Sequence, residues 1–235
     1  MDIKRKLLKL AGKDDFKLDG NIGIGYLLRV CWNYGWMLIR GKVFSLGYSD
    51  ISGDVFVGRN VKAIEKKKVS IGHKVKLHDG VYIDALSDGL GGVFLGDYVV
   101  LGRNTRIECT GGLSSIGHGV KIGNHSTFGN DCFLGAAGGI EIGDDVMAGQ
   151  FVRFHAENHV YDDLNRLVRE QGVTHKGIRI GNNCWIGSGA VFLDGAVLGD
   201  GCVVAANAVV TKEFPINSVI GGIPAKILKT RGKYL

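Results

Sequence analysis

Residues 180–212 read IGNNCWIGSGAVFLDGAVLGDGCVVAANAVVTK, and a six-residue pattern repeats along them. Each hexad begins with an aliphatic residue, continues with Gly or Ala, two variable positions and a small residue, and ends with one more variable position. Four hexads of this stretch begin at Ile180, Ile186, Leu198 and Val204. The same pattern runs back toward the N-terminus, with earlier hexads at Val57, Ile71, Leu95, Leu101, Ile116, Ile122, Phe128, Ile142 and Ala148.

A period of six with two inward positions predicts short strands joined by tight turns. The aliphatic residue points inward, the small residue fills the second inward position, and Gly or Asn takes the positive φ angles of the turns. Three hexads would close one triangular coil, and stacked coils would bury a continuous aliphatic column. The sequence therefore predicts an all-β solenoid. Cys132, Cys184 and Cys202 occupy the small inward position, so we expect them to serve packing.

Composition excludes several classes of protein. The 235 residues include 38 glycines but 2 prolines, and 45 % of them are hydrophobic, which excludes collagen and a disordered linker. Five cysteines without a CxxC pair argue against a disulfide framework and a zinc cage. We expect a cytoplasmic protein without a bound metal, because the start also lacks a convincing secretory signal.

The net charge of +6 is concentrated at the N-terminus. Residues 1–42 hold nine Lys and Arg against four Asp, and no basic face or motif marks the repeats, so nucleic-acid binding is not expected. Residues 26–42 combine Trp32, Tyr34 and Trp36 with aliphatic residues and flanking arginines. Such a segment predicts a helix that rests on the inner face of an anionic membrane, or one that packs on the main domain or a neighbouring subunit.

The hexads lose their phase between Phe154 and Ile178, which predicts a protruding loop over residues 155–178. A long excursion from a regular solenoid is usually functional. The loop holds three of the seven histidines, and imidazole is the side chain best suited to take a proton from a hydroxyl near neutral pH. His159 is the candidate general base, ahead of His155 and His175.

The hexads resemble those of the left-handed β-helix acyltransferases, the hexapeptide-repeat transferases, over roughly residues 55–231. This resemblance alone implies the left hand of the helix, because parallel crossovers are otherwise nearly always right-handed. We expect a helical, basic N-terminal segment over 1–54, the left-handed parallel β-helix over 55–214, and a short C-terminal helix or tail over 215–235. A homotrimer with sites between subunits is also implied.

The stretch from Ile142 through the loop to Trp185 is similar to galactoside and maltose acetyltransferases and to O-acetyltransferases of surface-polysaccharide synthesis. The resemblance implies that His159 deprotonates a sugar hydroxyl as it attacks acetyl-CoA, in the synthesis of lipopolysaccharide, capsule or exopolysaccharide. The saccharide acceptor would be free or lipid-linked. By position relative to His159, the residues implied to bind it are Asn130, Asp131 and Tyr161.

Three segments after the loop, residues 183–188, 205–212 and 221–226, match the coenzyme A track and the C-terminal signature of this family. Small residues would let pantetheine lie along the coils, and lysines would meet phosphates as point charges. The residues implied to contact acetyl-CoA are Trp185, Ser188, Ala206, Thr211, Lys212, Lys226 and Lys229. Lysines at 226 and 229, where arginine is often found, weaken bidentate phosphate contact.

Three alternatives keep the fold but change the function. The acceptor could be the amine of a nucleotide-linked aminosugar, although residues 1–54 show no phosphate-binding loop. The γ-type carbonic anhydrases share this fold and bind zinc through three histidines, for which His118, His155 and His159 have an approximate spacing. A solenoid without enzymatic activity is the third alternative.

Overall fold

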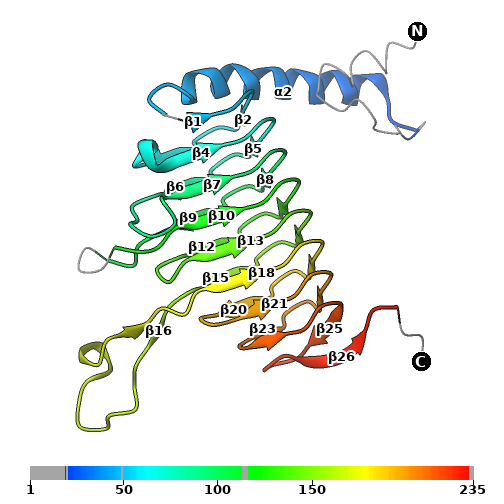
Figure 1. Cartoon of the computed structure of the whole chain (residues 1–235). Coiled ribbons are helices and arrows are strands. Elements are labelled where there is room, and N and C mark those ends of the chain that lie inside the picture. Colours follow the sequence, from blue (N-terminus) through cyan, green and yellow to red (C-terminus); the bar gives the residue numbers. More distant parts are fainter. Residues whose placement is uncertain (1–18, 20, 49, 113–115, 233–235) are drawn as a thin grey trace.

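A computed structural model describes residues 19, 21–48, 50–112 and 116–232 of the chain. Figure 1 shows a stack of triangular coils with a helix, α2 (Ile24–Phe44), laid across one end. The first part of the predicted N-terminal segment, residues 1–18, lies outside the described residues. The expected helix and the expected solenoid are both confirmed.

Each coil adds one short strand to each of three parallel sheets. The first sheet contains β1 (Asp50–Ile51), β4 (Val69–Ile71), β7 (Val93–Leu95), β10 (Val120–Ile122), β13 (Ile140–Ile142), β18 (Ile178–Ile180), β21 (Val197–Leu198) and β24 (Glu213–Phe214). The second contains β2 (Phe56–Val57), β5 (Lys76–Leu77), β8 (Val100–Leu101), β11 (Thr127–Phe128), β14 (Met147–Ala148), β19 (Trp185–Ile186), β22 (Val203–Val204), β25 (Ser218–Gly221) and β26 (Lys226–Thr230).

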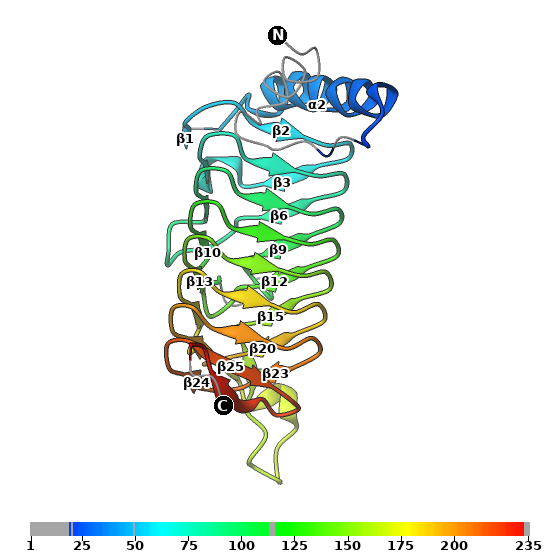
Figure 2. The same cartoon turned by 90° about the vertical axis from the view of Figure 1, so that its right-hand side faces the viewer.

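The third sheet, seen in order from top to bottom in Figure 2, contains β3 (Lys62–Ile64), β6 (Tyr82–Asp84), β9 (Arg106–Glu108), β12 (Phe133–Gly135), β15 (Arg153–His155), β20 (Val191–Leu193) and β23 (Val209–Val210). Two short 3₁₀ turns, η1 (Lys66–Lys68) and η2 (Val168–Glu170), lie outside the sheets. So does a small antiparallel pair, β16 (Asn158–His159) with β17 (Val173–Thr174).

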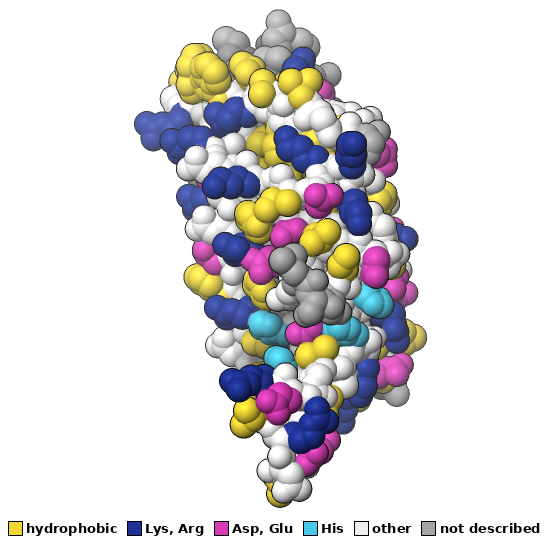
Figure 3. Space-filling model, turned by 90° about the vertical axis from the view of Figure 1, so that its left-hand side faces the viewer, with side chains coloured by type: hydrophobic (Ala, Val, Ile, Leu, Met, Phe, Trp, Pro, Cys, Tyr) yellow, Lys and Arg dark blue, Asp and Glu magenta, His cyan; other side chains and the backbone are white. Residues whose placement is uncertain are grey.

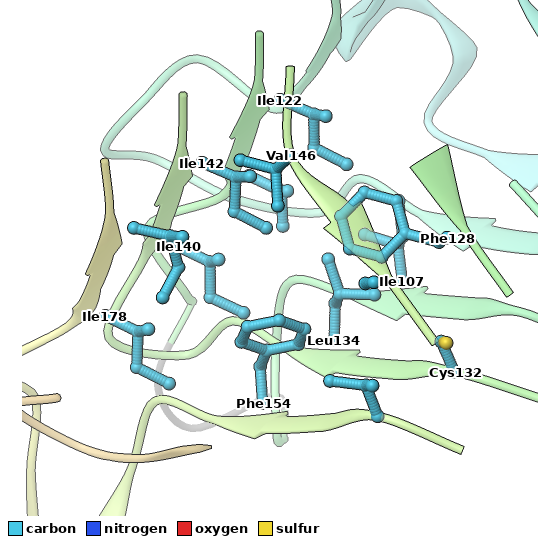
Figure 4. Packing of buried hydrophobic residues seen from close by; sticks show 14 of the residues in the cluster. Ile107, Ile122, Phe128, Cys132, Leu134, Ile140, Ile142, Val146, Phe154 and Ile178 are labelled. Carbon is cyan, nitrogen blue, oxygen red and sulfur yellow. The ribbon is translucent and has the colours of Figure 1, made fainter. Parts of the chain in front are cut away.

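The core is one column of inward side chains (Figure 4). Phe154 stacks on Phe192 of the next coil, with ring centroids 4.8 Å apart. The predicted packing role of the small inward cysteines is confirmed, since Cys132, Cys184 and Cys202 are buried. Burial raises the pKa of the Cys132 thiol to about 11, so this side chain stays a neutral thiol.

The solenoid has three edges, where the chain passes from one sheet to the next, and they differ in how many residues the connection contains. From the first sheet to the second, and from the second to the third, successive inward residues are always six apart, as in Ile122, Phe128 and Leu134. From the third sheet back to the first, the spacing ranges from four residues (Val210 to Phe214) to twenty-six (Phe154 to Ile180). We call this third edge the variable edge.

One predicted hexad is wrong. Ile116 is exposed rather than inward, and the inward aliphatic of its coil is Ile122. The reason is that Ile116 lies in the long connection between β9 and β10 at the variable edge and belongs to no strand, although it is six residues before Ile122.

Side-chain carboxylates and amides join successive coils at the edge between the first and second sheets. Each accepts a hydrogen bond from a backbone N–H of the preceding coil: Asp97 from His73, Asn124 from Asp97, Asp144 from Asn124, Asn182 from Asp144, and Asp200 from Asn182. The donor–acceptor distances are 2.6–2.8 Å. This ladder explains the Asp and Asn that follow glycine in many hexads.

The C-terminal segment differs from the expected helix or tail. Residues 226–230 form β26, which turns back and pairs antiparallel with β25 at the edge of the second sheet. Because β1 begins at residue 50 and β25 ends at 221, the solenoid also extends past the predicted bounds of 55 and 214 at both ends. The antiparallel strand covers the sheet edge that a parallel coil would leave open.

Helix α2 docks beside β2 on the first coil, where the Tyr34 ring meets the Phe56 ring edge-on with centroids 5.8 Å apart; its buried residues are Leu27, Met37 and Gly41. Gly41 permits this close approach, because a Cβ at this position would overlap the carbonyl oxygen of Val55. By contrast, nothing lies within 4 Å of the Cβ position of Gly35, in the middle of the same helix.

These two glycines form a matched pair for testing the docking of α2. We expect Gly41→Ala to lower the free energy of unfolding by about 1–3 kcal/mol, as overpacking does. Gly35→Ala should raise it by about 1 kcal/mol through helix propensity. Urea unfolding followed by circular dichroism measures both, and equal effects of the two substitutions would contradict the docking.

Candidate functional site

A cavity of about 290 Å³ opens at the variable edge, where the excursions of neighbouring coils lie beside one another. Its polar and aromatic lining comes from Glu108 at the end of β9, Thr110 after it, Phe133 of β12, His155 of β15, and Glu157 and His159 of the long loop. Figure 3 shows histidine side chains gathered on this face of the molecule, with acidic side chains among them.

The predicted protruding loop is confirmed. The chain leaves the solenoid after His155 and returns at Ile178, and the segment between extends away from the coils (Figure 1). Its stem is the antiparallel pair of β16 and β17, in which His159 lies opposite Val173. The tip is strongly exposed, with Leu164 at 95 %.

A buried carboxylate holds the end of the loop that returns to the solenoid. Asp194, 5 % exposed, accepts hydrogen bonds from the Thr174 hydroxyl at 3.1 Å and from the backbone N–H groups of Lys176 and Gly177 at 2.8 Å each. Asp194 follows β20 of the next coil, so the loop is tied to the coil after it. The sequence does not single out Asp194, because it takes the first variable position of the hexad that begins at Phe192, where Asp is common in other hexads.

An imidazole–carboxylate contact joins the two ends of the loop. The Nε2 atom of His175 lies 2.7 Å from a carboxylate oxygen of Glu157, and both side chains are partly buried. Glu157 precedes β16 and His175 follows β17, so this contact closes the base of the stem. The His118 ring lies next to it, with its centroid 6.2 Å from that of His175.

His155 and His159 differ in their surroundings. His155 ends β15 and packs against the Phe133 ring at 5.5 Å, and desolvation with the nearby Arg153 charge lowers its pKa. It is therefore held as a neutral ring in the cavity wall. His159 is exposed and also borders the cavity, so it can meet a hydroxyl that enters from solvent. Both histidines therefore line the cavity, and His159 is the more accessible of the two from solvent.

The predicted acceptor residues do not line this cavity. Asn130 and Asp131 lie on the edge between the second and third sheets, where Asn130 accepts a hydrogen bond from the Arg103 N–H and Asp131 one from the Asn104 side chain. Both bonds join successive coils, which is a structural role. Tyr161 is on the loop and 69 % exposed.

The predicted acetyl-CoA residues fall into three places. Ser188 and Ala206 lie on the edge between the second and third sheets, and Thr211 with Lys212 follows β23. Trp185 and Lys229 lie in one row across the second sheet, because Trp185 pairs with Val203, Val203 with Val219, and Val219 with Lys229. Lys226 lies in β26, opposite Gly221.

In one chain, His159 and the small residues Ser188 and Ala206 lie on different edges, with the width of the third sheet between them. A side of about six residues spans roughly 15–20 Å. His159 and Ser188 of one chain therefore cannot contact the same thioester.

The described residues contain neither a metal-binding cluster nor a membrane-spanning helix. Among residues 19–232 with their gaps, no three His, Cys, Asp or Glu side chains gather as a metal ion would require. In the same part of the chain, no helix has both the length and the apolar character needed to cross a membrane.

Comparison with known proteins adds the family. Residues 177–212 match the family described as "Bacterial transferase hexapeptide (six repeats)". The chain is 36 % identical over 124 residues to Protein CapG of Staphylococcus aureus, a match that covers 49 % of this chain and 69 % of the relative. The chain belongs to the hexapeptide-repeat transferases. The expected membership is confirmed, and with it the left-handed β-helix.

Two further members show how far the similarity extends. The galactoside O-acetyltransferase of Escherichia coli (strain K12) is 34 % identical over 91 residues, which cover 38 % of this chain and 43 % of that protein. The structure of a hexapeptide-repeat acetyltransferase from Vibrio cholerae O1 biovar eltor, complexed with acetyl coenzyme A, is 29 % identical with a TM-score of 0.51. The match covers 59 % of this chain and 71 % of that chain. Several other curated relatives are matched over about half of their length.

The attachment of the loop to Asp194 can be tested in this hexapeptide-repeat protein. We expect Asp194→Ala to leave the N–H groups of Lys176 and Gly177 unpaired, at a cost of about 1–3 kcal/mol, and to open the loop. Limited proteolysis should then cut within residues 158–176 about 5- to 100-fold faster, since about 1.4 kcal/mol corresponds to tenfold. Thr174→Val removes only the hydroxyl donor and should have a smaller effect. Unchanged cleavage in Asp194→Ala would show that other contacts hold the loop.

Proposed function

We propose that this protein transfers the acetyl group of acetyl-CoA to a hydroxyl of a saccharide, with His159 as the general base. The observation that carries the proposal is the position of His159 on a cavity with carboxylate and aromatic walls at the variable edge. The acetyl donor is supported by the acetyl-CoA complex of the Vibrio cholerae member, and the hydroxyl acceptor by the galactoside O-acetyltransferase.

The cavity has the chemistry that a sugar requires. Glu108 and Glu157 supply carboxylate oxygens that accept hydrogen bonds from hydroxyl groups, and the Phe133 ring supplies an apolar face for the C–H side of a pyranose. Its volume is at the small end of the roughly 300–1,000 Å³ typical of ligand pockets, which favours one sugar ring over a longer segment. We propose these three residues as acceptor contacts from the chain that supplies His159, whereas Asn130 and Asp131 could reach an acceptor only from the neighbouring subunit.

The reaction needs no covalent enzyme intermediate. The imidazole of His159 takes the proton as the sugar oxygen attacks the thioester carbonyl carbon. Backbone N–H groups near Ser188 stabilise the oxyanion, which then collapses as the carbon–sulfur bond breaks. The leaving sulfur takes the proton held by His159, so coenzyme A leaves as the thiol and the imidazole is neutral again. The products are an acetyl ester of the sugar and free coenzyme A.

We further propose that each site lies between two subunits of a homotrimer. His159 would come from one subunit, and Ser188 and Ala206 would come from the edge of its neighbour. The separation of these residues within one chain supports this arrangement. Trp185 and Lys229, in one row on the second sheet, together with Thr211, Lys212 and Lys226, would then carry the rest of coenzyme A toward the C-terminal end.

The biological acceptor that we propose belongs to lipopolysaccharide, capsule or exopolysaccharide synthesis, as the sequence resemblance implies. The reaction would take place in the cytoplasm, at the inner face of the membrane when the saccharide is lipid-linked.

The role of His159 has a direct test. His159→Ala should lower kcat for acetyl transfer at least a hundredfold and leave coenzyme A affinity unchanged, because only proton transfer is lost. His125→Ala is the matched control, since His125 stacks on Tyr98 at a solenoid corner outside the cavity. Steady-state kinetics and calorimetry measure the two effects. Near-normal turnover of His159→Ala would refute the assignment.

The acceptors used in that assay separate the alternatives. Sugars that carry hydroxyl groups only should be acetylated, whereas exclusive transfer to a nucleotide-linked aminosugar would make the protein an N-acetyltransferase. Stoichiometric zinc with hydration of carbon dioxide would indicate a carbonic anhydrase.

The composite site predicts complementation between inactive variants. His159→Ala lacks the base, and Ala206→Trp would block the coenzyme A track. In co-expressed mixtures, random assembly leaves roughly a quarter of the interfaces with both wild-type parts, so activity should return to about that fraction. An absence of recovery, with mixed trimers shown by mass spectrometry, would place each site within one subunit.

A further inference from the structure

Helix α2 has a second face that points away from the solenoid. While Leu27, Met37 and Gly41 are buried, the opposite side presents apolar side chains at helical spacing, with Lys42 beside them: Ile24, Leu28, Trp32, Trp36, Ile39 and Val43. All six are exposed, with Trp32 at 71 % and Val43 at 66 %. Surface helices normally place charged and polar residues on this side. We call these six residues the outer stripe.

The end of the molecule that carries the outer stripe is strongly basic. Residues 21–76 contain ten Lys and Arg against three Asp and Glu, a net charge of +7. The rest of the solenoid, residues 77–235, contains thirteen against sixteen, a net charge of −3. The positive charge of this chain is therefore gathered beside the apolar stripe.

The cations near α2 fall into two groups. Arg29 and Lys42 of the helix itself are exposed. Arg40 donates to the carbonyl of Val57 at 2.9 Å, and the ammonium of Lys76 lies 5.1 Å from the centroid of the Tyr34 ring, so these two lie on the solenoid side of the helix. Figure 3 shows hydrophobic side chains at the upper end of the molecule with Lys and Arg beside them.

We propose that the outer stripe binds the surface of an anionic lipid membrane, with α2 lying in the plane of the interface. An apolar helix face inserts at the boundary of headgroups and acyl chains, tryptophans are favoured at that depth, and flanking cations meet anionic headgroups. The 21 residues of α2 give a helix of about 30 Å, which lies along the membrane without crossing it.

Charge argues against the two other occupants of this face. A second copy docked stripe to stripe would press two ends of net charge +7 against each other, which is a different contact from the side-by-side packing of the proposed homotrimer. Residues 1–18 carry six Lys and Arg against three Asp, so they also have the same sign as the surface that they would cover. An anionic bilayer is the partner whose charge and apolar interior both complement this end.

The test is co-sedimentation of the full chain with vesicles of phosphatidylcholine, with and without phosphatidylglycerol. The protein should bind the vesicles that contain phosphatidylglycerol and be released by salt, because screening weakens the attraction. The double variant Trp32→Gln/Trp36→Gln should reduce the partition coefficient at least tenfold. Ile216→Gln removes an exposed apolar side chain from the other end of the solenoid and should bind as the wild type does.

Three outcomes would overturn the proposal. The wild-type chain could fail to bind vesicles containing phosphatidylglycerol. The double variant could bind as well as the wild type while its circular dichroism melting curve is unchanged, which would assign binding to another segment. Sedimentation velocity could show that the double variant changes the oligomeric state of the protein in the absence of lipid, which would make the stripe a contact between copies. None of these results depends on acetyl transfer.

Discussion

The requirement that every coil return to the same register governs this structure. Parallel strands of successive coils are hydrogen-bonded, so the inward residue of each strand must lie directly over the one before it. A slip of one residue would turn every inward side chain outward. Two edges satisfy the requirement with a fixed spacing of six residues, and there Asp and Asn side chains bond one coil to the next.

The third edge is free of that restriction, and the candidate site lies there. Once a strand of the third sheet has ended, the chain can leave the solenoid for any length, provided that it returns in register. The excursions after β9 and β15 both use this freedom, and together they enclose the cavity. The longest of them is anchored at its base by the hydrogen bonds of Asp194 and by the contact between Glu157 and His175.

The fold could be predicted because each hexad is recognised from residues that are close in the sequence. An aliphatic residue such as Ile180 and a small residue such as Cys184 specify a hexad without reference to distant contacts. The protruding loop that carries His159 could also be predicted, since the long break in the phase of the hexads is visible in the sequence. Counting back from His159 along the sequence does not show that Asn130 and Asp131 lie on the edge between the second and third sheets, as Ser188 and Ala206 do, so within one chain they are separated from the cavity. The strand formed by 226–230 could not be foreseen, because its partner β25 is already a hexad strand with its own neighbour.

The regular spacing of the coils fixes the distance between α2 and the cavity. Adjacent strands are separated by about 4.8 Å, and four such steps separate β3, in the coil beneath α2, from β15 at the cavity, a height of roughly 19 Å. If α2 rests on a bilayer, a lipid-linked saccharide must rise by that distance before its sugar meets His159. The number of coils between α2 and the loop would then determine which sugar unit of a growing glycan is modified, because only a unit at that distance from the membrane reaches the cavity.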